Sequence, residues 1–246
     1  MKEMSKSILR RMYDSNFVNR IFSGHGIDIG GFPDPLSLYL EFFPLVKSLK
    51  IWDLDDGDAQ FMEGIKDESF DFVVSSHCLE HLHDPKQGIT NWFRILKPSG
   101  YLVVTVPDED LYEQGTWPSN KNYDHKSTFT IYKKNSWSQK SHNILELLIS
   151  LGESAEIKKV ELIDRTHRYN FPKFDQTITP FSESAIELIV RKKTSEELRN
   201  LTNQTVDPKL KSSDLNRYLN QYTSDQITLR ETSRNKPPFQ DESDIN

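Results

Sequence analysis

The sequence contains a single cysteine, Cys78, among its 246 residues. An internal disulfide framework is therefore excluded, and a lone thiol is typical of a reducing compartment. No segment approaches the roughly 20 apolar residues that a membrane helix needs. The basic residues between Met1 and Arg11 are followed by no apolar run, so we find no signal peptide. We expect a cytoplasmic protein without a membrane span.

An excess of positive charge is missing as well. The 31 lysines and arginines are outnumbered by 37 aspartates and glutamates, for a net charge of −6. Nucleic acid is disfavoured as a partner, because no basic stripe is visible that could neutralise phosphates. Charged residues make up 28% of the chain and hydrophobic residues 35%, which is polar for one compact domain. Part of the chain is therefore expected to lie outside the core.

The composition changes near residue 193, after which Asn, Thr, Ser, Gln and charged residues dominate. We therefore divide the chain into a domain at 1–192 and a polar tail at 193–246, partly helical or disordered. Apolar residues between Val206 and Tyr222 could form one amphipathic helix of this tail. The tail could bind a protein partner, or it could be a linker to a further domain.

Short apolar runs alternate with helical patterns through the first 192 residues. The strands that they predict are Ile27–Ile29, Leu49–Trp52, Phe70–Ser75, Tyr101–Val106, Ile157–Ile163 and Ala185–Val190. The predicted helices are 4–22 (one helix or two short ones), Leu36–Val46, 84–96 and Ser138–Leu151. This order predicts an α/β fold, with a doubly wound, mostly parallel sheet and helices on both faces. The long insertion at 108–135 is of the kind that is usually functional.

The first predicted strand runs directly into a glycine turn, in the segment Gly26-Ile-Asp-Ile-Gly-Gly31. Glycine permits a positive φ and lets the backbone approach a ligand closely, as in the first turn of nucleotide-binding sheets. Asp28 adds a carboxylate at this place. The same pattern also fits an ordinary tight turn, so the segments that follow decide its meaning.

Four segments in a fixed order carry a family resemblance: Asp28-Ile-Gly-Gly31, Gly57-Asp-Ala-Gln60, Ser69-Phe-Asp-Phe-Val-Val-Ser-Ser-His-Cys-Leu-Glu-His-Leu-His-Asp-Pro85 and Arg94-Ile-Leu-Lys-Pro-Ser-Gly-Tyr-Leu102. Over residues 20–192 the chain resembles the class I S-adenosylmethionine-dependent methyltransferases, most closely those that methylate small molecules, lipids and sugars. The resemblance implies a Rossmann-like fold, S-adenosyl-L-methionine as cofactor, and methyl transfer as the reaction.

The resemblance also implies a role for each matching position. The methionine end of the cofactor would face Asp28, Gly30 and Gly31, the ribose would face Asp53, the adenine would face Asp58 and Ala59, and the sulfonium would face Ser76 and His77. Two departures stand out. Phe32 occupies a position where another glycine is common. Only four residues separate Asp53 from Asp58, too few for the usual third strand at the sheet edge, which leaves Asp55 and Asp56 as alternatives to Asp53.

A hydroxyl acceptor needs a base, and histidine suits that role near neutral pH. The candidates are His125 in the insertion and His81 in the motif, with His77 and His83 less favoured. Asp124 could orient the ring of His125 or bind a substrate hydroxyl. Structural roles remain open: His81 as a cap, His125 as a polar loop residue. A divalent metal is conceivable where acids and histidines are dense, at Glu80, His81, Asp108, Asp124 and His125. Because their spacing matches no metal motif, we predict no metal site.

The insertion, with Tyr112, Trp117 and the run Asn122-Tyr-Asp-His-Lys126, resembles that of enzymes of glycan biosynthesis. We therefore favour O-methylation of a sugar or glycan in polysaccharide biosynthesis. One alternative is methylation of another small metabolite. The other is a non-catalytic binding or scaffold protein with a methyltransferase fold, whose segment 193–246 docks a partner.

Overall fold

The computed structural model describes residues 2–202 and residue 227. The chain separates into two units, Met1–Leu198 and Arg199–Asn246. Helix α4 (Ser195–Thr202) lies at this division, inside the segment predicted as a polar tail. The helix predicted between Val206 and Tyr222 lies outside the described residues. Among the described helices, none combines the length and the apolar character needed to cross a membrane.

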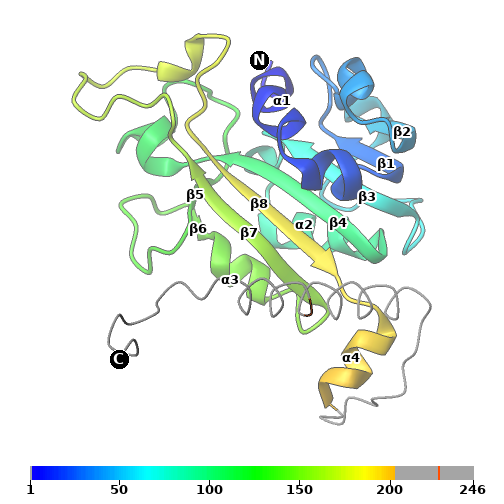
Figure 1. Cartoon of the computed structure of the whole chain (residues 1–246). Coiled ribbons are helices and arrows are strands. Elements are labelled where there is room, and N and C mark those ends of the chain that lie inside the picture. The colour runs from blue at the N-terminus through cyan, green and yellow to red at the C-terminus, as the bar shows by residue number, and fades with distance from the viewer. Residues whose placement is uncertain (1, 203–226, 228–246) are drawn as a thin grey trace, which may run out of the picture. The chain divides into compact units, whose positions relative to one another are not determined.

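A six-stranded sheet forms the centre of the first unit (Figure 1). Its strands, in spatial order, are β2 (Val46–Trp52), β1 (Gly24–Ile29), β3 (Phe70–Ser76), β4 (Leu96–Pro107), β8 (Ala185–Lys192) and β7 (Ala155–Ile163). The first four are parallel, and β8 is antiparallel to both β4 and β7. This arrangement confirms the predicted α/β, doubly wound and mostly parallel sheet of Rossmann-like type.

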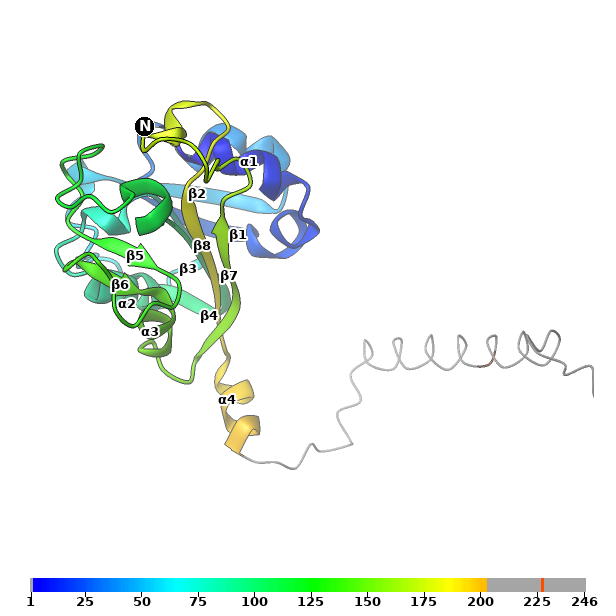
Figure 2. The same cartoon turned by 90° about the vertical axis from the view of Figure 1, so that its left-hand side faces the viewer.

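Helices cover both faces of the sheet because side chains alternate along each buried strand. In β3, Phe72 and Val74 join the apolar cluster under α1 (Met4–Met12), while Val73 joins the cluster on the opposite face. That second cluster includes residues of α2 (Pro85–Arg94) and α3 (Ile144–Ile149). Figure 2 shows α1 on one side of the sheet and α2 and α3 on the other.

The edge strand that is usual between β2 and β3 is missing from this sheet, as the short spacing predicted. Within residues 53–69 the only regular element is the 3₁₀ turn Leu54–Asp56. The connection is instead held close to the sheet by two tryptophans. Trp52 Nε1 donates to the Gly57 carbonyl (3.1 Å), and Trp92 Nε1 donates to the Ala59 carbonyl (2.8 Å).

The helical predictions were less accurate than the strand predictions. Residues 4–22 form two elements, α1 and a π-helical turn at Phe17–Ile21. The predicted helix Leu36–Val46 is wrong beyond Phe42: a 3₁₀ helix spans Leu36–Phe42, and Val46 already belongs to β2. Pro44 accounts for the early end, because the residue before a proline is driven out of the helical region.

The prediction of a helix at Ser138–Leu151 was wrong in its first half. Residues Ser141–Asn143 form β6, a short strand that pairs in parallel with β5 (Thr128–Thr130). Only α3 is helical, and Asn143 caps it by accepting hydrogen bonds from Leu145 N (3.0 Å) and Glu146 N (3.3 Å). The helix predicted at 84–96 is shorter in the structure, where α2 ends at Arg94 and β4 already begins at Leu96.

The remaining elements are short helical turns in the connections between strands. They are the 3₁₀ turn Leu79–His81, the π-helical turn Glu109–Glu113 and the 3₁₀ turn Gln176–Ile178.

A buried ion pair fastens α1 across the antiparallel part of the sheet. Arg11 on α1 and Glu187 on β8 are both fully buried, with Arg11 Nη2 2.8 Å from Glu187 Oε2. Arg11 also donates to Thr105 Oγ1 on β4 (3.1 Å). At the other end of α1, Ser5 N donates to Asp34 Oδ2 (2.8 Å), in the segment that follows the glycine turn of β1, where the site lies.

Candidate cofactor and acceptor site

Two adjoining cavities open at the carboxyl ends of the parallel strands, the usual place for ligands in such sheets. The first has a volume of about 180 Å³, and we call it the acidic cavity; it is lined by Glu3, Met4, Asp28, Gly30, Gly31, Phe32, Pro33, Asp34, Ser76, His77, Glu80, His81, Tyr112, Asn122, His125 and Thr177. The second, of about 420 Å³, we call the tryptophan cavity; it is lined by Gly30, Trp52, Asp53, Leu54, Gly57, Asp58, Ala59, Gln60, Cys78, His81, Leu82, His83, Asp124 and Lys126. Gly30 and His81 line both cavities, so the two are contiguous.

Asp28 is a buried carboxylate at the wall of the acidic cavity. Its Oδ2 accepts a hydrogen bond from Leu36 N (2.7 Å), whereas no donor reaches Oδ1. Burial raises the pKa of Asp28 to about 7, although the bond from Leu36 works in the opposite direction. An unpartnered carboxylate oxygen of this kind is suited to a cationic ligand group.

The glycine turn after β1 requires glycine at two positions. Gly30 has φ +72°, and a Cβ there would lie 2.6 Å from Cys78 Cβ. A Cβ at Gly31 would lie 3.0 Å from Asp28 Oδ2. Phe32, in place of a further glycine, is 62% exposed, and its N–H donates to Asp53 Oδ2 (2.9 Å). A hydrogen bond to the end of β2 therefore fixes this turn.

The residues after β2 form one wall of the tryptophan cavity. Of the three acids Asp53, Asp55 and Asp56, only Asp53 lines it. The Asp53 carboxylate also accepts from Leu54 N (2.9 Å), which caps the short 3₁₀ turn. Asp58 and Ala59 line the same cavity, and Asp58 Oδ1 is fixed by Gln60 N (2.8 Å).

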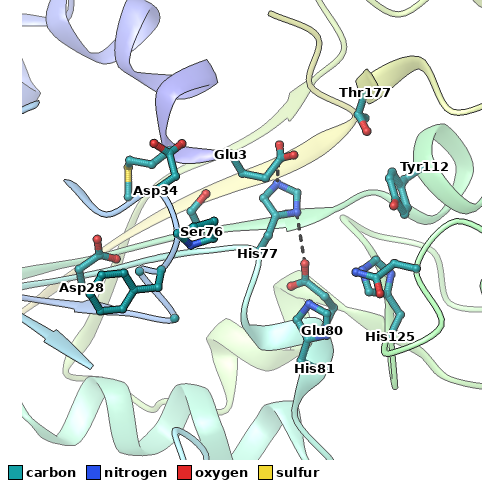
Figure 3. Close-up of a pocket in the computed structure, with 16 residues that line it drawn as sticks. Glu3, Asp28, Asp34, Ser76, His77, Glu80, His81, Tyr112, His125 and Thr177 are labelled. Atoms are coloured by element: carbon teal, nitrogen blue, oxygen red, sulfur yellow. Dashed lines mark ion pairs between the residues drawn. The ribbon is translucent and has the colours of Figure 1, made fainter. Parts of the chain in front are cut away.

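Ser76 and His77 lie at the end of β3, on the wall of the acidic cavity. Ser76 Oγ is buried and has no hydrogen-bond partner. His77 has φ +56° and lies between two acids, with Nδ1 3.2 Å from Glu80 Oε1 and Nε2 3.8 Å from Glu3 Oε2 (Figure 3). Burial alone would lower the pKa of His77, but its contact with Glu80 and the charges of both acids raise it above its usual value.

Glu80 is fully buried beneath three histidines. Neither of its carboxylate oxygens receives a hydrogen bond, and its contact with His77 falls outside hydrogen-bond geometry. Burial would raise the pKa of Glu80, but His77, together with the charges of His81 and His125, holds it below its usual value. The three histidines therefore favour the ionised form of Glu80 inside the cavity wall.

Each of the two candidate base histidines is oriented by a carboxylate. His125 Nδ1 lies 2.7 Å from Glu113 Oε1, and both side chains are buried. His81 Nδ1 lies 2.8 Å from Asp124 Oδ2. The interpretation that Asp124 orients His125 is therefore wrong: Asp124 points to His81 instead. Both residues belong to a tight turn in which His125 N donates to the Asn122 carbonyl (3.2 Å), and their side chains diverge.

Backbone contacts hold the His125 segment against the turn Leu79–His81. The Glu80 carbonyl accepts hydrogen bonds from Lys126 N (2.8 Å) and Ser127 N (3.2 Å). Lys126 Nζ donates to the His81 carbonyl (2.6 Å). The insertion therefore packs over the motif, and the rings of His81 and His125 meet edge to face with centroids 5.1 Å apart.

Sequence reasoning missed three acids at this site: Glu3, Asp34 and Glu113. Glu3 is brought in by the docking of α1, and Asp34 accepts from Ser5 N (2.8 Å) at the start of that helix. Glu113 ends the π-helical turn that follows β4. The contacts of these three acids join segments that are distant in sequence. No spacing in the sequence could therefore have identified the acids as site residues.

Comparison with known proteins finds a family match in the middle of the chain. Residues 45–104 match the model of a methyltransferase domain family. The match runs from the start of β2 to the centre of β4, and includes Asp53, Asp58, Ala59, Ser76 and His77.

Two curated proteins resemble parts of the chain. The first is a probable S-adenosylmethionine-dependent methyltransferase of Mycolicibacterium smegmatis, 35% identical over 51 residues, which cover 21% of this chain and 20% of that protein. The second is an uncharacterised protein of Methanocaldococcus jannaschii, 29% identical over 87 residues, or 35% of this chain and 40% of that protein. The similarity thus spans less than half the length of either relative.

Solved structures share the fold over about three quarters of the chain. A candidate methyltransferase of Bacillus halodurans superposes with a TM-score of 0.51 at 17% identity, covering 76% of this chain and 100% of that one. An S-adenosylmethionine-dependent methyltransferase of Clostridium acetobutylicum gives 0.50 at 11% identity, covering 79% and 93%. The solved structures show that the chain has the Rossmann-like fold of these proteins, and the methyltransferase-domain match covers residues 45–104 within it.

Proposed function

We propose that the chain methylates a hydroxyl group of a small polar acceptor, most specifically a sugar or glycan. The contiguity of the two cavities at Gly30 and His81 carries this proposal. A ligand with a nucleoside part and an amino-acid part would fill the tryptophan cavity with the first and enter the acidic cavity with the second. Its reactive centre would then lie near His81 and close to His125.

The residues present fit S-adenosylmethionine. Asp28 Oδ1 and Ser76 Oγ are buried polar atoms without a protein partner. Gly30 and Gly31 carry no side chain, so the turn after β1 leaves room beside these atoms. Asp28 suits the ammonium group, and Asp53 suits the ribose hydroxyls. Bound there, the cofactor supplies an electrophilic methyl group on a positively charged sulfur.

The Glu113–His125 pair suits removal of the acceptor proton. Nδ1 of His125 donates to Glu113, which leaves the lone pair on Nε2 as the proton acceptor. A carboxylate behind the ring fixes this tautomer and stabilises the imidazolium that forms, by the logic of a catalytic triad. We assign His125 as the base; Asp124 and His81 form a second such pair at the junction of the cavities.

Polar groups in the acidic cavity favour a hydroxylated acceptor over an apolar ring. Glu3, Asp34 and Asn122 offer oxygens that can accept hydrogen bonds from hydroxyls. The Tyr112 hydroxyl is buried without a partner, and its ring lies 5.4 Å from that of His125. This lining supports a sugar as acceptor. The second enzymatic candidate, another small metabolite such as one with a quinone-like ring, would fit a more apolar lining.

Titration calorimetry with S-adenosylmethionine and S-adenosylhomocysteine tests the cofactor site. We expect micromolar binding of both to the full chain, and at least a tenfold loss in Asp53→Ala. Asp55→Ala is the matched control, because Asp55 is the neighbouring acid that does not line the cavity. Release of S-adenosylhomocysteine in the presence of a panel of sugars, glycans and phenols then identifies the acceptor class.

Absence of binding would remove the enzymatic proposal and favour the non-catalytic alternative. That alternative assigns the function of residues 193–246 to binding a protein partner. Cofactor binding without turnover on sugars, but with turnover on a phenol, would instead support the second enzymatic candidate.

A further inference from the structure

Three side chains that could bind a metal ion converge where the insertion packs on the motif. One ligand atom each from Glu80, His81 and His125 lies within 4.8 Å of the others. All three belong to the acids and histidines noted in the sequence, but no metal-ligand spacing joins them there, because His125 belongs to a different segment from the adjacent pair Glu80 and His81. Two imidazoles and one carboxylate are a donor set known for catalytic Zn²⁺ and for Fe²⁺.

Both histidines are prepared as ligands by their outer contacts. Metal-binding histidines usually donate the ring N–H that faces away from the ion to a carboxylate, which fixes the tautomer and raises the basicity of the ligand nitrogen. Nδ1 of His125 is engaged by Glu113 at 2.7 Å, and Nδ1 of His81 by Asp124 at 2.8 Å. In each ring Nε2 is therefore left with its lone pair.

The carboxylate of the set provides an independent observation. Glu80 is fully buried and borders the acidic cavity, yet neither oxygen receives a hydrogen bond. Leaving a buried polar group unsatisfied is destabilising, and more so for a charged one. His77 compensates part of the charge from 3.2 Å at Oε1, but no pairing with Oε2 accompanies it.

We propose that Glu80, His81 and His125 bind one first-row divalent transition-metal ion, with Zn²⁺ as the best match. Donors about 2.1 Å from a tetrahedral ion lie about 3.4 Å apart. The present separations of up to 4.8 Å therefore close by rotations of side chains whose backbones are already tied together. The acidic cavity leaves a coordination position open to a small ligand.

Binding of the ion is independent of the proposed methyl transfer, whereas its use on an acceptor rests on that function. An ion in this place takes the Nε2 lone pair of His125, so His125 is a ligand when the ion is bound, and the role of base assigned to it above applies to the metal-free chain. It then lowers the pKa of a hydroxyl bound to it, so that near neutral pH the O–H bond breaks and the proton passes to solvent water in the cavity. Mg²⁺, which prefers oxygen ligands, is a poor match for this set.

The test uses the full chain, free of any polyhistidine tag and stripped by a chelator. Titration with Zn²⁺, followed by calorimetry, is expected to give one ion per chain at micromolar affinity or better. Co²⁺ is expected to give the visible absorption bands of a site of low coordination number. Glu80→Gln and His125→Gln are each expected to weaken Zn²⁺ binding at least tenfold.

His25→Gln is the matched control, because His25 is an exposed histidine outside both cavities. Thermal melts establish that the variants fold, and His81→Gln, at a half-buried position, replaces any buried variant that does not. Zn²⁺ binding that is absent, or equally tight in the folded ligand variants and in His25→Gln, overturns the proposal. S-adenosylhomocysteine titrated into the same samples separates the two proposals, since each ligand can bind when the other does not.

Discussion

Glu113 and His125 form a buried pair, with Oε1 2.7 Å from Nδ1 and side chains only 1% and 4% exposed. They come from the two ends of the segment that follows β4, and the pair brings the histidine to the wall of the acidic cavity. An acid in this position makes the histidine either a directed base or a directed metal ligand. In both cases, replacing Glu113 tests the role of His125.

Glu113→Gln is expected to lower the rate of methyl transfer about 10²–10⁴-fold, because an amide neither fixes the required tautomer nor stabilises the imidazolium. The rate of S-adenosylhomocysteine release measures the effect. Asp124→Asn, which changes the exposed acid that contacts His81, should lower the rate of methyl transfer less. A Glu113→Gln variant that folds and keeps the full rate would show that His125 is not the base.

Asp28→Asn is expected to change how stability depends on pH. The pKa of Asp28 is about 7 in the folded chain and 3.8 in the reference state, so the folded state holds more protons between these values. The stability contributed by the protonated group is complete below the lower value, and is lost as the pH rises through the higher one. Relative to the variant, the wild type should lose roughly 3 kcal/mol between pH 5 and pH 8.

Urea unfolding of both proteins across this range measures the difference, and other titrating groups cancel to first order in it. Parallel curves would contradict a buried, neutral Asp28. The variant should also bind S-adenosylhomocysteine more weakly at pH 8, because the carboxylate that faces the ammonium group is gone.

Gly30→Ala is expected to be more harmful than the same change at Gly64. Both glycines have positive φ, +72° and +76°, so each alanine costs roughly 1–2 kcal/mol of left-handed strain. A Cβ at Gly64 meets nothing within 4 Å, whereas at Gly30 it overlaps Cys78. Gly30→Ala should therefore add about 1–3 kcal/mol of overpacking. Denaturant unfolding of the two variants tests this, and equal losses would refute the close packing of the turn.

Glu187→Gln should destabilise the chain by about 3 kcal/mol or more, because it leaves the buried guanidinium of Arg11 without its carboxylate. Glu156→Gln is the comparison: Glu156 pairs with Arg191 at the surface (3.0 Å), where such pairs contribute about 1 kcal/mol or less. Chemical unfolding should separate the two variants clearly. Similar losses would mean that the Arg11 contact does not hold α1 on the sheet.

The strands could be predicted because each is a short apolar run with its own local signal. The run Phe70–Ser75 lies in β3 as predicted. The short spacing from Asp53 to Asp58 correctly predicted that the usual third strand is missing from the sheet edge. Where local and tertiary preferences disagree, the prediction was wrong. Ser141–Asn143 fits a helical pattern, yet it pairs with Thr128–Thr130 as a strand.

The site residues also divide into those with a local sequence signal and those that depend on tertiary structure. Gly30, Asp53 and Ser76 follow strand ends, so topology alone brings them to one edge of the sheet, and the structure places them around the cavities. The partners of His125 and His81 depended on how the insertion folds back, which no spacing encodes. The roles assigned to all these residues stay predictions until ligands are measured.

The missing third strand has a consequence for solubility. It turns β2 into an edge strand, and an unpaired edge is a template for pairing with another chain. Lys47 and Lys50 are exposed along β2, and Lys158 is exposed on β7 at the opposite edge. Charged side chains of this kind oppose edge-to-edge association. The shortened sheet therefore keeps both of its borders protected against aggregation.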